Sequence, residues 1–257
     1  GVTDVGGRAF CQAGSRAFAV IGGGFYELFE GQTVTRHGSL AQDANPATIS
    51  YNGIVGGQLF ITSGGNGYCF VLATNTLSTV LTAEATMGGF CTGYFLAFNA
   101  ANGKVRLSNL NDGTVWNAAT FWQRSRQPDP YRAMFVDGNS LVWMIGTESF
   151  EVRYNAGVLT QPFEPLTGLE GRYGIVAPFA WGLVGSSRLW LAQNREGPGP
   201  VVMTTGGTPQ PISTYPVSAA LASYARTATL DDAELVAYQA DGHTFGCFSF
   251  PRANRTW

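Results

Sequence analysis

The chain has 257 residues, and a chain of this length buries roughly 75% of the surface that its unfolded form exposes. Charged residues make up 12% of it and 34 residues are glycine, which argues against a helical bundle and against a disordered tail. The formal charge is −2 and Lys104 is the only lysine, so the sequence lacks the clustered basic patch that tight nucleic-acid binding needs. No apolar run reaches the length of about 18 residues that a transmembrane helix requires, so no membrane insertion by this segment is expected.

A loose repeat organises the chain from its start to its end. Six segments each predict strand, turn, strand, turn, strand, at residues 9–30, 47–73, 88–110, 131–154, 175–204 and 233–257. Glycines that tolerate the positive φ of a hairpin turn recur in them at intervals of about 40–50 residues, the usual length of a propeller blade. The sequence therefore predicts an all-β fold, a β-propeller of about six blades built from antiparallel meanders.

The strands of these segments differ in polarity. Middle strands such as 18–21 and 141–145 are continuously apolar, as expected of strands covered on both faces. The strand at 150–154 alternates and is predicted to be half exposed. One short helix is predicted near 214–224, between the fifth and sixth segments, with Ser213 or Thr214 as its cap and Pro216 in its first turn.

The sequence shows no domain boundary inside the chain, and its last segment is incomplete. Composition never shifts along the chain, so residues 1–257 are expected to form a single β-propeller domain. The sixth segment stops at Thr256-Trp257, where its third strand is expected to begin. Either the chain continues beyond this point or an N-terminal strand completes the ring, and we favour the first, which makes the sequence an excerpt of a longer chain.

A polar turn ending in tryptophan carries the clearest single motif. Asn109, Asn111, Gly113 and Trp116 follow the spacing of the Asp-box, the S/T-x-D-x-G-x-x-W turn of sialidase-like propellers. In that motif a carboxylate ties down the turn and the tryptophan packs beneath it. Asparagine stands at both polar positions here. We interpret these four residues as a structural turn, with a sugar or metal contact as the alternative.

The sequence contains no clear motif for a catalytic, metal-binding or cofactor-binding site. A glycosidase needs two carboxylates facing one funnel, and the candidates are distinguished only by being acidic. These acids are Asp129, Asp137, Glu148, Glu164, Glu170 and Glu234. Glu234, beside Leu235, is the one whose setting predicts a raised pKa. We assign no catalytic, cofactor-binding or metal-binding residue.

The remaining candidate groups also favour structural roles. Both histidines are separate from any serine elbow, and His37 is predicted to lie in a solvated loop, His243 in a hairpin turn. The glycine runs 22–24 and 64–67 join strand to strand and are predicted to be hairpin turns, since no helix follows to bind phosphate.

The four cysteines and three aromatic residues are also predicted to have structural roles. Four cysteines far apart lack zinc-site spacing and are expected to be buried thiols, although a disulfide stays open. Phe121, Trp122 and Tyr131 are expected to bury the crossing between two blades, with a protein partner or a stacked sugar or nucleic-acid base as alternatives.

The order of several motifs resembles a known family, the packaged-DNA stabilisation proteins of short-tailed bacteriophages, also called tail hub or nozzle proteins. Residues 105–257 carry the resemblance best, and Phe179-Ala180-Trp181 departs from it where a polar residue is expected. The series comprises Ser108–Trp116, Pro128-Asp129, Trp143–Thr147, Glu151-Val152, Asn155–Gly157, Pro162-Phe163, Ala177-Pro178, Leu189–Leu191, Pro211–Thr214, Gly242–Phe245, Phe250-Pro251 and Thr256-Trp257.

The resemblance implies a structural protein of the virion without enzymatic activity. Such a protein assembles in the bacterial cytoplasm as a homo-oligomeric ring, expected to be a hexamer, and extends the DNA exit channel below the portal and adaptor proteins. It retains packaged DNA, contacts it transiently in the lumen during ejection, and anchors a tail fibre, spike or needle protein. The alternatives are a carbohydrate-active or carbohydrate-binding sialidase-like propeller and a generic protein-binding propeller.

Overall fold

The computed structural model describes residues 6–123, 126–159, 161–227 and 229–257. The chain divides into two compact units: Gly1–Gln123 with Gly157–Pro162, and Arg124–Ala156 with Phe163–Trp257. Within the described residues the strands form six antiparallel sheets that follow one another along the chain, three in each unit. The prediction that residues 1–257 are a single domain stays a prediction.

The first unit holds the first, second and third sheets, each with four strands. The first sheet contains β1 (Gly7–Ala13), β2 (Arg16–Ile21), β3 (Gly24–Leu28) and β4 (Val34–Ser39), with a 3-10 turn at Glu30–Gln32. The second contains β5 (Thr48–Tyr51), β6 (Gln58–Ser63), β7 (Asn66–Val71) and β8 (Thr76–Leu81). The third contains β9 (Met87–Cys91), β10 (Tyr94–Asn99), β11 (Lys104–Asn109) and β12 (Asp112–Trp122).

The second unit holds the fourth, fifth and sixth sheets. The fourth contains β13 (Tyr131–Val136), β14 (Val142–Gly146), β15 (Phe150–Asn155) and β16 (Phe163–Gly171). The fifth contains β17 (Gly174–Ile175), β18 (Trp181–Val184), β19 (Ser187–Asn194), β20 (Gly197–Thr204) and β21 (Gln210–Pro211). The sixth contains, within the described residues, β22 (Glu234–Ala240), β23 (His243–Phe250) and β24 (Arg255–Thr256).

Five of the six predicted segments coincide with the first three strands of a sheet. The fifth segment coincides with β17 to β20, which is most of the fifth sheet. The fourth strands β4, β8, β12 and β16 lie outside the segments predicted from the sequence. Their burial explains why: β4 is mostly exposed and β8 alternates between exposed and half-buried residues, so neither has an apolar run. These residues form strands because their backbone pairs with the neighbouring strand, although their side chains are mostly not hydrophobic.

The middle strands are buried on both faces, as predicted. All five residues of β14 are buried, and Phe18, Ala19 and Val20 of β2 are buried as well. Two stacked rings, Phe18 and Phe25, pack edge-on against Phe70 of the second sheet, with centroids 5.6 Å and 5.1 Å apart. The core of the first unit is therefore formed between successive sheets, each covering its neighbour.

The prediction that strand 150–154 is half exposed is wrong. Glu151 is 1% exposed and Arg153 is 3% exposed, because β16 covers the edge of β15 and the two charges neutralise each other. Arg153 Nη2 lies 3.1 Å from Glu151 Oε1, and the Tyr131 hydroxyl donates a hydrogen bond to the same oxygen. Alternation here marks a buried polar network and not a solvent face.

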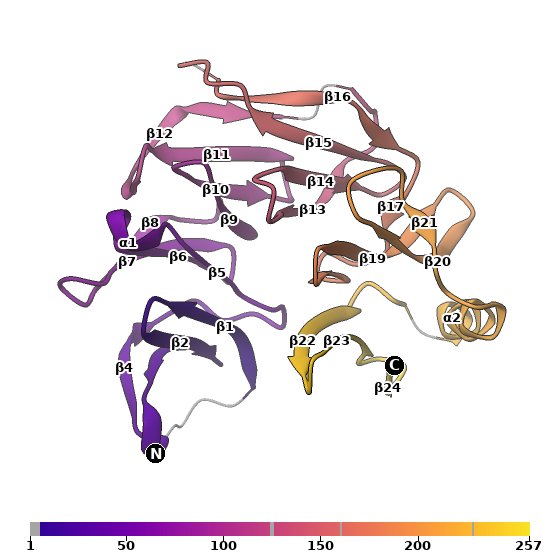
Figure 1. The fold of residues 1–257 in the computed structure, drawn as a ribbon, viewed down its shortest axis with the longest axis horizontal. Coiled ribbons are helices and arrows are strands. Elements are labelled where there is room, and N and C mark those ends of the chain that lie inside the picture. The colour runs from indigo at the N-terminus through magenta and orange to yellow at the C-terminus, as the bar shows by residue number, and fades with distance from the viewer. Residues whose placement is uncertain (1–5, 124–125, 160, 228) are drawn as a thin grey trace. The chain divides into compact units, whose positions relative to one another are not determined.

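The predicted helix is α2 (Tyr215–Thr227), which lies between the fifth and sixth sheets as expected (Figure 1). The Thr214 carbonyl accepts the amide hydrogen bond of Ser218 at 3.0 Å, so Thr214 occupies the cap position. Leu221 is buried and the helix packs on β20. A second helix, α1 (Gly53–Gly56), was not predicted, since four residues are too few to show helical periodicity.

A buried carboxylate joins the fourth and fifth sheets. Asp137, in the loop from β13 to β14, accepts hydrogen bonds from the Asn139 and Leu141 amides at 2.8 Å and 3.0 Å and from Trp143 Nε1 at 2.7 Å. Arg188 of β19 reaches it from the next sheet, with Nη2 2.5 Å from Oδ2. Arg188 is 2% exposed and its guanidinium carbon lies 5.7 Å from the centre of the Trp143 ring.

Replacing Asp137 by alanine is expected to lower the free energy of unfolding by about 3–5 kcal/mol, because it leaves the Arg188 charge buried without a partner. Asp137→Asn keeps an acceptor for the loop amides and is expected to cost less. Chemical denaturation of the three proteins measures both effects. A loss below about 1 kcal/mol for Asp137→Ala, the range of a surface pair, would contradict this account.

Candidate functional site

The predicted structural turn joins β11 to β12 in the third sheet. Asn109 pairs with Asp112 across the hairpin, which leaves Leu110 and Asn111 as its two-residue loop. Asn111 has φ 54°, a left-handed conformation that asparagine adopts more readily than most residues. Its amide donates to the Gly93 carbonyl at 2.6 Å, so the tip of this hairpin is tied to the turn between β9 and β10.

The carboxylate that ties down this turn is Asp112, which is not one of the four predicted residues. Its Oδ1 accepts from the Thr114 amide at 2.9 Å and from the Thr114 hydroxyl at 2.6 Å. The hydrogen bond from that hydroxyl is the main reason that the pKa of Asp112 lies below its ordinary value. An Asp followed two residues later by Thr is the sequence signal that could have found it.

Gly113 and Trp116 occupy positions with little free space. A Cβ added at Gly113 would lie 2.8 Å from the Phe95 ring and 3.2 Å from Cys69 Sγ, so a larger side chain would have to displace the core. Trp116 donates from Nε1 to the Gly113 carbonyl at 2.8 Å, and its ring lies 4.9 Å from Phe60 of the second sheet.

Two amide side chains of the second sheet extend this packing into a joint between sheets. Gln58 accepts from the Gly113 amide at 2.8 Å and donates to Asp112 Oδ1 at 3.4 Å. Asn52 accepts from the Gln58 amide at 2.8 Å and donates to the Asn111 carbonyl at 3.4 Å. The arrangement holds neighbouring sheets together and presents no activated nucleophile. Sequence reasoning missed Asn52 and Gln58 because they are distant along the chain.

The candidate acids are spread over separate contacts. Asp129 accepts from the amides of Glu148 and Ser149 and from the Ser149 hydroxyl, which caps the turn between β14 and β15. Glu148 pairs with Arg195 and Glu170 with Arg126, at 2.6 Å and 3.1 Å. Glu164 is exposed. Glu234 behaves as predicted, since burial raises its pKa and the charge of Asp232 adds to the effect.

The prediction of a solvated His37 is wrong. The residue lies in β4, its side chain is largely buried, and Nε2 is 2.8 Å from Glu27 Oε2. Arg16 forms two further hydrogen bonds to the same carboxylate, at 2.6 Å and 2.7 Å, and reaches the Leu72 carbonyl in the second sheet at 2.9 Å. The Arg16 hydrogen bond is the main cause that lowers the pKa of Glu27.

The other predicted groups occupy structural positions. The glycine runs 22–24 and 64–67 form the β2–β3 and β6–β7 turns, as predicted. His243 is exposed at the start of β23, with its ring 6.3 Å from Phe245. Trp122 and Tyr131 are buried, and Phe121 is half-buried. Among the described residues, no three His, Cys, Asp or Glu side chains gather closely enough to hold a metal ion.

The chain matches, over residues 1–257, the family of phage stabilisation proteins described as "Bacteriophage P22 Gp10, beta-propeller". The chain belongs to this family. It is therefore a bacteriophage structural protein, a component of the virion, and its six sheets are the blades of a β-propeller. The sequence resemblance is confirmed at the level of the family and of the fold. No curated protein matches the chain, and no described helix is long and apolar enough to cross a bilayer.

Several solved structures share the fold of this chain. BBS1N in complex with ARL6DN aligns with 98% of this chain and 76% of its own, at TM-score 0.60 and 9% identity. A catalytically inactive virginiamycin B lyase from Staphylococcus aureus with quinupristin aligns with 99% and 80%, at TM-score 0.55 and 8% identity. A protein of unknown function from Desulfotomaculum acetoxidans aligns with 79% and 70%, at TM-score 0.56 and 12% identity. Identities this low establish the shared fold alone.

The pKa of Glu27 yields a prediction about acid stability. A carboxylate whose pKa is lowered by folding contributes stability above its ordinary pKa of 4.5 and loses it as the pH falls through the lowered value. We expect the Tm difference between the protein and the Glu27→Gln variant to be largest near neutral pH and to shrink below pH 4.5. A difference that stays constant across this acid range would contradict the role of the Glu27 charge.

Cys69, which contacts the turn, yields a prediction about thiol reactivity. Burial, helped by the nearby Asp112 charge, raises the pKa of Cys69 to about 12. We expect iodoacetamide in mildly alkaline buffer to leave Cys69 unmodified in the folded protein and to modify it after denaturation, because the thiolate is the reactive form. Peptide mapping by mass spectrometry measures this. Modification of folded Cys69 as fast as that of a free cysteine would contradict the packing described.

Proposed function

We propose that the chain is part of a ring-forming tail hub, or nozzle, that extends the DNA exit channel below the portal and adaptor proteins and retains packaged DNA. The observation that carries this proposal is the family match over residues 1–257. The ring is a homo-oligomer, a hexamer, that assembles in the bacterial cytoplasm and anchors a fibre, spike or needle protein. It acts without enzymatic activity, because its work is to hold and release DNA.

The charge of the chain supports a channel through which DNA slides. Each phosphate contact by Lys or Arg strengthens binding to DNA and slows its passage. Lys104 is the only lysine, and the arginines described above at Arg16, Arg153 and Arg188 are occupied by carboxylates inside the fold. A channel lined by such a subunit would contact DNA only transiently.

Exposed apolar residues support assembly with other subunits. Ile54 and Val55 of α1 are 89% and 96% exposed. Leu110, at the tip of the adjoining turn, is 60% exposed, and the Asn52–Asn111 hydrogen bond holds the two loops together. Apolar side chains gathered at one place on a surface are typical of regions that a neighbour covers.

Native mass spectrometry and electron microscopy of the purified full-length protein test the ring. We expect a closed ring and expect the double variant Ile54→Ser, Val55→Ser to reduce the ring fraction while leaving the Tm of the dissociated chain unchanged, because both side chains are exposed in the single chain. Val158→Ser, at another exposed apolar residue, serves as the matched control. A full-length protein that stays monomeric and is absent from purified virions would contradict the proposed function.

A further inference from the structure

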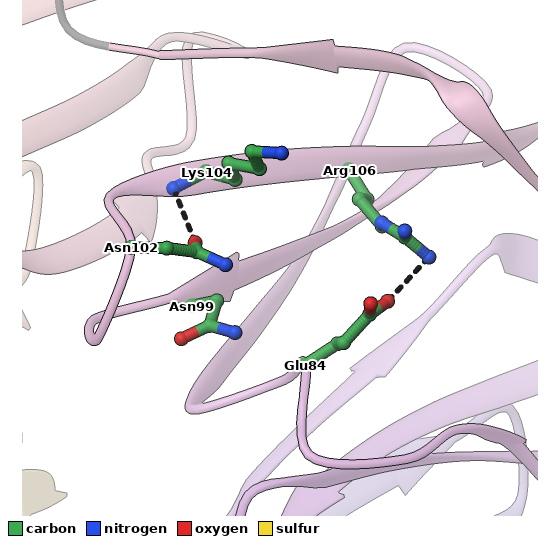
Figure 2. Close-up of a pocket in the computed structure, with 5 residues that line it drawn as sticks. All are labelled: Glu84, Asn99, Asn102, Lys104 and Arg106. Carbon is green, nitrogen blue, oxygen red and sulfur yellow. Dashed lines mark hydrogen bonds and ion pairs between the residues drawn. The ribbon is translucent and has the colours of Figure 1, made fainter.

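A small pocket lies in the first unit, between the β10–β11 hairpin of the third sheet and the segment that connects β8 to β9 (Figure 2). None of its residues belongs to the turn described above. The lining residues are Glu84, Asn99, Asn102, Lys104 and Arg106. Four of the five therefore come from the β10–β11 hairpin or its ends, and Glu84 comes from the connecting segment.

The register of the third sheet brings the two cations to the pocket. Lys104 and Arg106 are two residues apart on β11, so their side chains lie on the same face. Lys104 pairs with Asn99 of β10, and Phe121 of β12 lies opposite Arg106. The third sheet thus places an ammonium, a guanidinium and an aromatic ring on one surface.

The two cations are held in different ways. Arg106 forms an ion pair with Glu84. The Lys104 ammonium lies 4.4 Å from the centre of the Phe121 ring, a cation–π contact that steadies it without using its N–H groups. Within the described part of the chain, no carboxylate lies within ion-pair distance of Lys104. Its donors are therefore available to a ligand.

The asparagines add to the donor character of the pocket. Asn102 Oδ1 accepts from the Lys104 backbone amide at 2.9 Å, which leaves the side-chain nitrogen of Asn102 on the pocket side (Figure 2). Asn99 is fixed by the Ala101 amide at 2.9 Å and by the Ala83 carbonyl at 3.2 Å. The pocket thus presents N–H donors from a pre-arranged turn.

We propose that this pocket binds a side-chain carboxylate from an acidic segment of a protein partner. Its two cations and one anion leave a single net positive charge, which one carboxylate neutralises and a phosphate dianion exceeds. A DNA phosphodiester carries the same single charge, and the comparison with a DNA oligonucleotide below distinguishes it from a carboxylate. Carboxylates also accept charge-assisted hydrogen bonds from ammonium and guanidinium groups. This assignment goes beyond the proposed ring and does not depend on it, because the pocket is complete within one unit of one chain.

The single lysine makes the pocket directly observable. Lysine-selective 13C labelling gives a Lys Cε signal from Lys104, the only lysine in residues 1–257, and comparison with the Lys104→Arg variant identifies it. The probe is the blocked peptide acetyl-Gly-Glu-Gly-amide, and its matched control is the same peptide with Gln in place of Glu. We expect a saturable shift with the Glu peptide and none with the Gln peptide at equal ionic strength.

Two variants separate binding from folding. Arg106→Gln is expected to weaken binding of the Glu peptide by about tenfold, as loss of a charged hydrogen bond does, while Arg195→Gln, at an exposed ion pair elsewhere, leaves it unchanged. Glu84→Gln removes the anion of the pocket and is expected to tighten binding, which provides a test even if Arg106→Gln lowers Tm.

Several results would overturn the assignment. These are the absence of a saturable shift with the Glu peptide, equal shifts with the two peptides, and unchanged binding in Glu84→Gln. Tighter binding of inorganic phosphate or of a DNA oligonucleotide than of the Glu peptide would assign the pocket to phosphate instead. None of these results bears on whether the full-length protein forms a ring, so the two proposals fail separately.

Discussion

Every sheet that has a neighbour on each face must bury side chains on both sides, and this constraint determines the rest of the structure. It makes middle strands such as β14 apolar throughout. It also forces any charge in these strands to find a partner inside, because an unpaired buried charge is costly. Glu27 of β3 and Glu151 of β15 are therefore each surrounded by donors, and so is Asp137 in the loop before β14. Arg188 reaches Asp137 from the adjoining sheet, and Arg16, which binds Glu27, also donates to the Leu72 carbonyl after β7.

These contacts explain how far the sequence could predict the fold. Hydrophobic runs and turn glycines locate the three inner strands of each sheet because both signals are local. The outer strands β4 and β8 carry neither signal, since edge pairing needs only backbone groups. His37 and strand 150–154 were misjudged for one reason: a polar residue was assumed to face water, whereas Glu27 and Arg153 supply partners that are invisible in the local pattern.

At the candidate functional site, the turn at Asn109–Trp116 also depends on partners that the local sequence pattern does not reveal. The spacing of Asn109, Asn111, Gly113 and Trp116 predicts a structural turn, but the strand β12 that follows it within the same sheet was not predicted. It did not reveal that Asp112 holds the turn, because the motif assigns the carboxylate to the preceding position. Gln58 and Asn52 could not be found from the sequence at all, since only the fold brings the second sheet to this loop.

The joints between neighbouring sheets are built from different sets of residues. The first two sheets meet through an arginine and a carboxylate among phenylalanines, the next pair through amides and a tryptophan, and the fourth and fifth through Asp137 and Arg188. Each joint is thus free to change in evolution by compensating substitutions at one interface alone. A substitution at one joint therefore needs compensation only from the residues of that joint, and the six segments can keep their order of strands while their joints differ.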